Sequence, residues 1–307
     1  MKTRNTHAVA AAVLLFSLLG AGDGRADVLY VANQNNNTIE KYTAGGVNSP
    51  FASTGNGPFG VAFDGAGNLY VANAPDNTIH KITPGGVSSP FASTGLATPA
   101  GMAFDQAGNL FVANFSNASI AKFTPDGVGS IFATTDLNHP IGLAFDTAGN
   151  LYAANAGNST IAKFTPDGTG SIFTSTDIST PFGLAFDLLG NLYVANSGTA
   201  SIEKFTPGGV SAHFASSGLT QPLGLAFDSA GYLYVADNSV GSIVKIGPDG
   251  SSSVFATTGP VGPDSLAFTD DDGHPILMPG GFLVPEPGSL ALLLSASALA
   301  ALRRRRD

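Results

Sequence analysis

A repeat of 41 residues constrains the fold of this chain more than any other feature of its sequence. One glycine recurs with this period, at Gly60, Gly101, Gly142, Gly183 and Gly224. A phenylalanine lies three residues after each glycine and occurs once more near the end, at Phe63, Phe104, Phe145, Phe186, Phe227 and Phe268. No insertion interrupts the register, so residues 28–268 consist of copies of one supersecondary unit.

Each copy contains four short runs of strand-forming residues. In the copy from Leu143 to Gly183 the runs are Leu143–Asp146, Leu151–Asn155, Thr160–Thr165 and Ser171–Ser175. They are rich in aliphatic, aromatic and Thr residues, and no window shows the 3.6-residue period of an amphipathic helix. Asp-x-x-Gly-Asn separates the first two runs, and Pro-Asp-Gly or Pro-Gly-Gly separates the last two, as is typical of tight hairpins. We therefore predict four antiparallel strands in each copy.

Repeated four-stranded units of this length are typical of a β-propeller, in which each sheet is a blade packed on its neighbours. The first copy lacks its first strand, because the repeats open with the second-strand run Leu29–Asn33. At the other end, Leu266–Phe268 is a first strand without the rest of a unit. Pairing these two runs would give an all-β, six-bladed propeller over residues 27–269, closed by strands from both ends of the chain.

The repeat resembles those of known propeller families. Its pattern, G-[LVM]-A-F-D-x-x-G-N-L-Y-V-A-N followed by I-x-K-[FI]-x-P-x-G, is similar to the NHL-repeat propellers. It also resembles, more loosely, the gluconolactonase-like and virginiamycin B lyase propellers. The resemblance implies the fold, but not one function, because propellers include binding proteins, scaffolds and enzymes.

The N-terminal residues 1–26 have the features of a secretory signal peptide. Lys2 and Arg4 precede an apolar run, Ala8–Leu19, and small residues lead to a predicted cleavage after Ala26. The run is short for a membrane span. The alternative is a buried N-terminal helix, but the repeats begin at once and leave it nothing to pack on.

The C-terminal segment, residues 284–307, follows a predicted linker over residues 270–283. It begins with Pro285, Glu286 and Pro287, continues as the apolar run Leu290–Leu302, and ends in the basic residues Arg303, Arg304, Arg305 and Arg306. We expect a short apolar transmembrane helix with the arginines as a cytoplasmic stop. A plain C-terminal anchor is the alternative. Thirteen apolar residues span only about 20 Å as a helix, so a plain anchor would need a thin membrane.

This segment resembles the PEP-CTERM sorting signal of Gram-negative bacteria. In that family, an exosortase in the inner membrane recognises the Pro-Glu-Pro motif, removes the tail and releases the protein toward the cell surface or the extracellular polysaccharide. The resemblance implies that the Sec export machinery and an exosortase are partners. It also implies transient anchoring in the inner membrane.

Charge and cysteine content exclude some classes of partner. Residues 27–283 carry six lysines against nineteen Asp and Glu side chains, a net charge of −13. Such a charge argues against nucleic acid and anionic lipid. The chain has no cysteine, so neither disulfides nor thiolate metal sites stabilise it. All six lysines occupy one repeat position, and we expect their ammonium groups in water or paired with an Asp of a neighbouring blade.

Binding residues should be departures from the repeat, because a specific site requires asymmetry. The connections between second and third strands, and between fourth and first strands, should share one face of the propeller. On that face Asn35 and Asn36 form part of an Asn-rich rim, and Phe115 and His139 are isolated ring side chains, so these four are our candidate binding residues. An exopolysaccharide or an envelope protein would suit such a face.

Catalytic and metal sites are harder to find in the sequence. His80, His139, His213 and His274 occupy non-equivalent positions, so they predict no shared metal site. Asp270-Asp271-Asp272-Gly273 lacks the alternate spacing of a calcium loop, and we interpret it as a solvated turn. We expect no metal, no cofactor and no catalytic residues, and a protein that acts by binding. The alternative is a propeller lactonase or lyase with a metal in the central channel, although Glu40 and Glu203 occupy outer-strand positions and no catalytic His and Glu pair can be matched.

Overall fold

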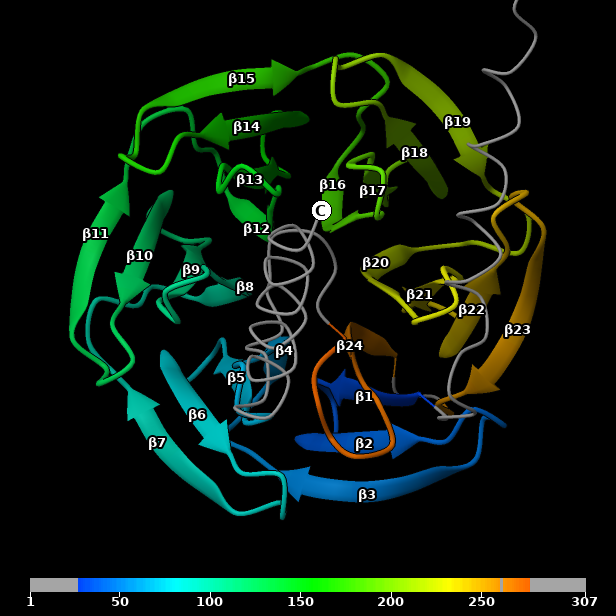
Figure 1. The fold of residues 1–307 in the computed structure, drawn as a ribbon, viewed down its shortest axis with the longest axis horizontal. Coiled ribbons are helices and arrows are strands. Elements are labelled where there is room, and N and C mark those ends of the chain that lie inside the picture. The colour runs from blue at the N-terminus through cyan, green and yellow to red at the C-terminus, as the bar shows by residue number, and fades with distance from the viewer. Residues whose placement is uncertain (1–26, 260–261, 277–307) are drawn as a thin grey trace, which may run out of the picture.

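The computed structural model describes residues 27–259 and 262–276, which form six four-stranded antiparallel sheets arranged in a ring (Figure 1). This confirms the predicted propeller. Within these residues no helix is long and apolar enough to cross a membrane. The predicted signal peptide, the Pro285–Pro287 motif, the terminal arginines and both terminal helices lie outside the described residues.

Five blades are continuous in sequence, and we number them in chain order. Blade 1 consists of β4 (Pro58–Phe63), β5 (Leu69–Asn73), β6 (Thr78–Ile82) and β7 (Ser88–Ala92). Blade 2 consists of β8 (Pro99–Phe104), β9 (Leu110–Asn114), β10 (Ser119–Phe123) and β11 (Gly129–Ala133). Blade 3 consists of β12 (Pro140–Phe145), β13 (Leu151–Asn155), β14 (Thr160–Phe164) and β15 (Gly170–Thr174).

The remaining blades complete the ring. Blade 4 consists of β16 (Pro181–Phe186), β17 (Leu192–Asn196), β18 (Ser201–Phe205) and β19 (Ser211–Ala215). Blade 5 consists of β20 (Pro222–Phe227), β21 (Leu233–Asp237), β22 (Ser242–Ile246) and β23 (Ser252–Thr257). Blade 6 joins β24 (Pro263–Thr269) to β1 (Val28–Asn33), β2 (Thr38–Tyr42) and β3 (Asn48–Ser53). First strands begin at the repeat proline, earlier than predicted from residues such as Leu143, because that proline already pairs with the second strand, as Pro140 does with Asn155.

The two ends of the chain meet in blade 6, as predicted. β24 pairs antiparallel with β1, and the register places Leu29 opposite Phe268 and Val31 opposite Leu266. In Figure 1 the two strands lie side by side although more than 230 positions separate them. This ladder gives β1 the first-strand partner that every other second strand has, so blade 6 is a complete four-stranded sheet.

Aromatic side chains fill the space between blades. Tyr152 on β13 packs edge-to-face on Phe173 of its own blade, with ring centroids 5.2 Å apart, and on Phe186 of blade 4 at 5.1 Å. The same pair of contacts recurs in every blade, around Tyr30, Tyr70, Phe111, Tyr193 and Tyr234. Edge-to-face pairs are favourable beyond the area they bury. Each aromatic residue therefore joins two blades.

The period-41 glycines lie where adjacent first strands touch around the axis. A Cβ atom at Gly142 would overlap the carbonyl oxygen of Phe182 on the next blade. The same holds between each of the other four glycines and the blade that follows it, through the carbonyls of Ala100, Ile141, Leu223 and Asp264. Only glycine permits this backbone-to-backbone approach. In blade 6 the position is Ser265, whose hydroxyl accepts a bond from the Val61 N–H at 3.4 Å.

In blades 2, 3 and 4 a buried Asn at the end of the second strand holds the connection between blades. Asn155 Oδ1 accepts a hydrogen bond from the Asn138 N–H at 3.1 Å, and its Nδ2 donates to the Asp136 carbonyl at 2.9 Å and to Thr160 Oγ1 at 3.0 Å. Asn114 and Asn196 bind their connections in the same way, and Asp237 accepts equivalent bonds in blade 5. These side chains satisfy loop amides that would otherwise be unpaired.

The lysines pair within their own blades, which corrects our expectation of neighbouring-blade partners. Lys163 Nζ lies 3.7 Å from Asp146 Oδ2 and 5.1 Å from the ring centroid of Tyr152, all in blade 3. Blades 1, 2, 4 and 5 repeat this ion pair. The reason is that the first-strand Asp and the third-strand Lys flank the same second-strand aromatic residue, whose face holds the ammonium between them. In blade 6, Lys41 lies over Phe51, and Thr269 replaces the Asp.

Asp264 is a buried carboxylate in the closing strand, and only 5% of its surface is exposed. Its Oδ2 accepts from the Gln34 N–H at 3.1 Å and its Oδ1 from Asn238 Nδ2 at 3.2 Å. Burial raises the pKa of Asp264 to about 7. The equivalent residues in the other blades are Phe59, Ala100, Ile141, Phe182 and Leu223.

We predict that Gly142→Ala destabilises the propeller by about 3 kcal/mol or more, because the added methyl must displace the blade 4 backbone. Gly85→Ala is the matched control, since the nearest atom to a Cβ there is 3.8 Å away and belongs to Thr83. Chemical denaturation of both variants measures the difference. Equal stabilities would contradict backbone packing at the axis.

We also predict a pH-dependent stability from Asp264. Between about pH 4 and pH 7 the folded state holds a proton that the unfolded carboxyl has lost, so the free energy of unfolding falls as the pH rises. Asp264→Asn should remove this pH-dependent decrease in the free energy of unfolding, which is of the order of 1–4 kcal/mol. The measurement is the difference between the wild-type and variant unfolding free energies across this window. Parallel pH profiles would show that the carboxyl ionises freely.

Candidate functional site

The propeller has two chemically different faces. The hairpin face carries the turns between first and second strands and between third and fourth strands. The loop face carries the connections between second and third strands and between blades. Pro166, on a third-to-fourth hairpin, lies beside Gly149, on a first-to-second turn, which places both kinds of turn on one side.

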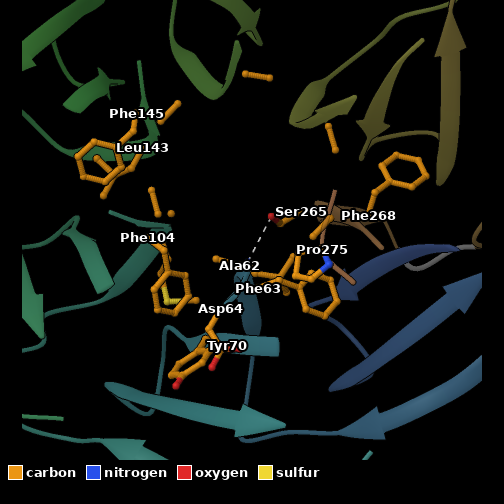
Figure 2. Close-up of a pocket in the computed structure, with 18 of the residues that line it drawn as sticks. Ala62, Phe63, Asp64, Tyr70, Phe104, Leu143, Phe145, Ser265, Phe268 and Pro275 are labelled. Atoms are coloured by element: carbon orange, nitrogen blue, oxygen red, sulfur yellow. Dashed lines mark hydrogen bonds between the residues drawn. The ribbon is translucent and has the colours of Figure 1, made fainter. Parts of the chain in front are cut away.

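A cavity of about 750 Å³ occupies the centre of the ring and opens on the hairpin face. Its walls are the six first strands, which contribute glycine, aliphatic, alanine and phenylalanine residues (Figure 2). Pro275 and Ile276 lie at its margin, as do the charged residues Asp64, Lys81 and Asp105. Lys81 is paired with Asp64 at 3.4 Å, and Lys122 with Asp105 at 3.6 Å. This lining suits an apolar ligand better than acid–base chemistry.

The loop face brings two of the four predicted binding residues together. Phe115, in the loop between β9 and β10, stacks on His139, in the connection from β11 to β12. Their ring centroids are 4.7 Å apart and the planes meet at 36°. Phe115 is half-buried and His139 is exposed. His139 has a positive φ of 48°, which turns the connection back toward blade 2.

Asn35 and Asn36 lie elsewhere on the ring. Both are exposed in the loop between β1 and β2 of blade 6, and blade 1 separates them from Phe115. Asn36 Oδ1 accepts bonds from the Thr38 hydroxyl at 2.6 Å and the Thr38 N–H at 3.3 Å. Its side-chain oxygen therefore stabilises the turn. The structure thus groups Phe115 with His139 and places the two asparagines apart from them.

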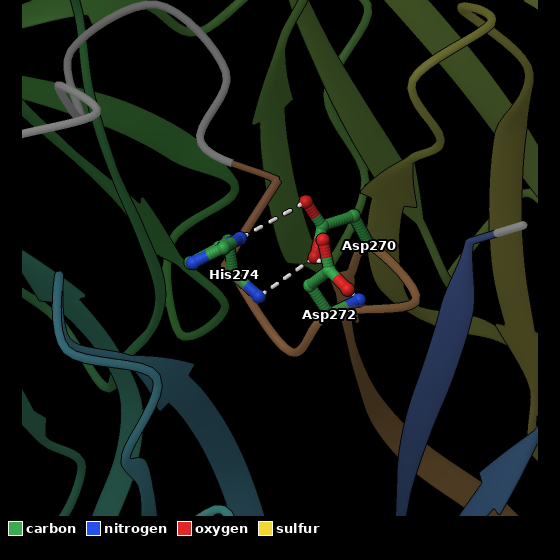
Figure 3. A group of neighbouring side chains, drawn as sticks. All are labelled: Asp270, Asp272 and His274. Atoms are coloured by element: carbon green, nitrogen blue, oxygen red, sulfur yellow. Dashed lines mark hydrogen bonds and ion pairs between the residues drawn. The ribbon is translucent and has the colours of Figure 1, made fainter. Parts of the chain in front are cut away.

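The turn after β24 contains a cluster of Asp270, Asp272 and His274 (Figure 3). Their potential ligand atoms lie within 4.8 Å of one another. Asp270 Oδ1, however, accepts from the N–H groups of Asp272 and His274, and Oδ2 lies 3.2 Å from His274 Nδ1. The first-to-second turn of blade 5 shows the same pattern, with Asp228 Oδ1 accepting from Ala230 and Tyr232. Asp270 therefore stabilises the turn after β24 as Asp228 stabilises the turn of blade 5. Its position is shifted by one residue relative to the repeat.

Blade 4 contains a carboxylate–imidazole pair that the sequence analysis missed. His213 Nδ1 on β19 lies 3.0 Å from Glu203 Oε1 on β18, and Ser201 Oγ donates to the same oxygen at 3.0 Å. Both residues are on outer strands, away from the central cavity. The pair borders a groove of about 650 Å³ that also contains Asp177 and Ser211. The only signal in the sequence was that Glu203 and His213 both depart from the repeat. They lie ten residues apart on the two strands of one hairpin.

The fold agrees with solved propellers. One is a chain of a nidogen/laminin complex, at TM-score 0.71 and 20% identity over 79% of this chain and 98% of that one. Another is selenomethionine-substituted virginiamycin B lyase from Staphylococcus aureus, at TM-score 0.60 and 17% identity over 79% and 82%. A third is a catalytically inactive histidine-to-alanine variant of that lyase with quinupristin, at TM-score 0.64 and 14% identity over 82% and 94%. At these identities the likeness shows the fold alone.

The family assignment comes from a different comparison. No curated protein matches the chain. The model of the virginiamycin B lyase family matches residues 5–261, which include all of blades 1–5. The sequence resemblance to that family's repeat is thereby confirmed, and the chain belongs to the virginiamycin B lyase family.

Proposed function

We propose that this chain is an exported binding module that presents its loop face to a surface or matrix partner. The observation that carries the proposal is the stacked pair of Phe115 and His139. The positions equivalent to Phe115 in the other blades are Gln34, Ala74, Ala156, Ser197 and Asn238. A half-buried aromatic residue at one position of a polar rim is typical of a contact residue at an interface.

Export and sorting complete the proposal. Residues 1–26 would direct the chain to the Sec machinery with cleavage after Ala26, and the Pro285–Pro287 motif would be recognised by an exosortase. The apolar run and the four terminal arginines would hold the chain in the inner membrane until the tail is removed. The partner is then an exopolysaccharide or an envelope protein. Recognition of a protein is supported in general by the propeller chain of the nidogen/laminin complex.

A lyase is the second candidate, favoured by the family membership. One relative is described as a virginiamycin B lyase with quinupristin, and an acid–base mechanism would need a titratable pair beside the substrate. In the described residues the central cavity is lined mainly by apolar side chains. This lining favours binding over catalysis. Incubation of the chain with quinupristin, followed by liquid chromatography and tandem mass spectrometry, tests this candidate, and formation of a new product, even one of unchanged mass, would make catalysis the primary function.

We predict that Phe115→Ser with His139→Thr weakens partner binding by about tenfold or more, through loss of a buried aromatic contact. Ser197 is the repeat equivalent of Phe115 and Thr180 is that of His139, so each replacement occurs naturally at its own repeat position and the fold should tolerate both. The measurement is retention of the protein on the producer's exopolysaccharide and on its envelope proteins. Val128→Ser is the control, because Val128 is 66% exposed on the hairpin face. Equal retention of both variants would place the binding site elsewhere.

We predict that Glu286→Gln combined with Pro285→Ala and Pro287→Ala traps the protein in the inner-membrane fraction, because the sorting motif is lost while the apolar run remains. Pro279→Ala, just outside the motif, is the control and should leave surface delivery unchanged. Cell fractionation with immunodetection measures the distribution. Delivery of the triple variant to the surface would contradict exosortase processing.

A further inference from the structure

The groove on blade 4 has a composition found in no other blade. Glu203 and His213 are directly paired across the β18–β19 ladder. The equivalent pairs are Ala121 with Ile131, Ala162 with Ile172, Val244 with Val254, Glu40 with Pro50 and His80 with Pro90. Glu40 also carries a carboxylate, but Tyr42 and Asn48 bond to it within its own blade. Blade 4 alone has an ionisable group on both strands.

Three of the hydroxyl protons of the groove, those of Thr199, Ser201 and Ser211, are used inside it. Ser201 Oγ donates to Glu203 Oε1, so in the 3.0 Å contact between Thr199 and Ser201 the Thr199 hydroxyl is the donor. His213 Nδ1 donates to the same Glu203 oxygen at 3.0 Å, because an ionised carboxylate only accepts. In the neutral imidazole this leaves Nε2 as an acceptor. The groove therefore presents mainly hydrogen-bond acceptors, and a ligand must supply the hydrogen-bond donors.

The charge of the groove points to a cationic donor. Glu203 is only 8% exposed, and its carboxylate accepts hydrogen bonds from the Ser201 hydroxyl and the His213 imidazole. The neighbouring Lys204 is paired with Asp187 at 3.6 Å, on another part of the blade. Asp177 adds a second carboxylate, which accepts from Ser211 Oγ at 2.6 Å. A largely buried carboxylate that shares a groove with a second one is stabilised by a positively charged partner, and charge-assisted hydrogen bonds are the strong ones.

The shape and lining of the groove identify the rest of the ligand. Its volume of about 650 Å³ is several times that of an ammonium group. Ser179, Ser211 and Ser216 line it together with Thr199, whereas its aliphatic lining is limited to Ile178 and Ala212. A lysine side chain would bring an ammonium group but no hydroxyl groups to match these walls. A sugar ring brings hydroxyl groups that match the hydroxyl-rich walls.

We infer that the blade 4 groove binds an amino sugar unit of a glycan, with the free ammonium directed to Glu203 and the ring hydroxyls against the serine walls. His213, fixed through Nδ1, accepts a hydrogen bond from a sugar hydroxyl at Nε2. The inference deepens the proposed binding function but concerns a separate site, away from Phe115 and His139. It names the class of glycan, which is one with free amino groups.

The test is isothermal titration calorimetry of the full chain with a glucosamine tetramer at about 0.15 M salt and about pH 7. This pH lies between the ordinary pKa of an imidazole and that of an amine, so an imidazole Nε2 can accept while the ligand carries ammonium groups. The N-acetylated tetramer keeps the hydroxyls and lacks the charge, and acetyl-lysine amide, acetylated at Nα only, keeps one ammonium group and lacks the sugar. We expect the glucosamine tetramer to bind about tenfold or more tightly than either. The decisive variant is Glu203→Ala with His213→Ile, which installs the pair that blade 3 carries as Ala162 and Ile172.

This double variant should fold, and we expect it to bind the glucosamine tetramer about tenfold or more weakly than the wild type. Unchanged binding by the variant would overturn the inference, because attraction of a polycation to an acidic protein would then explain the affinity. Binding of acetyl-lysine amide as tight as that of the tetramer would overturn it as well, and so would no binding at all. Phe115→Ser with His139→Thr should keep its affinity for the tetramer, so failure of the loop-face proposal remains distinguishable.

Discussion

Backbone contact between first strands around the axis is the constraint on which this structure depends. Five glycines allow each first strand to lie against the carbonyl of the next, at a distance that excludes a Cβ atom. The approach fixes how closely six sheets converge. It also explains why glycine recurs at this position, because a side chain there would point into the contact. The second strands then lie close enough for one aromatic ring to pack on two blades at once.

This constraint separates positions that serve packing from positions that are free to vary. Inner strands, second-strand aromatics and the Lys–Asp pairs repeat because each joins elements that every blade has. Other positions of the outer strands and the exposed positions of the loop face make no contact that recurs in every blade. The pairs formed by Phe115 and His139, and by Glu203 and His213, both lie there. Specificity can change at these sites without disturbing closure, which is how one fold hosts different functions.

The sequence was sufficient for the architecture because period, turn residues and strand length all agree. It was insufficient where contacts depend on which way a side chain points. Lys163 could be assigned to either blade until the Tyr152 ring placed it against Asp146. Glu203 and His213 face each other only because a register shift follows Ile202, and spacing alone does not reveal a bulge. Likewise, the 41-residue period identified Gly142 as a repeated position. It did not show that the close carbonyl of the next blade is what requires glycine there.

Blade 6 solves the closure problem with polar groups where the other blades use apolar ones. Ser265 replaces the axial glycine, and Asp264 replaces an apolar residue. Asp264 and Ser265 bind amides of Gln34 and Val61, so β24 is joined to β1 and blade 1 by side-chain bonds as well as by the ladder. Hydrogen bonds specify register more strictly than apolar contact does. A strand that must find its partner from the far end of the chain needs that specificity, whereas strands joined by a short hairpin obtain their register from the turn.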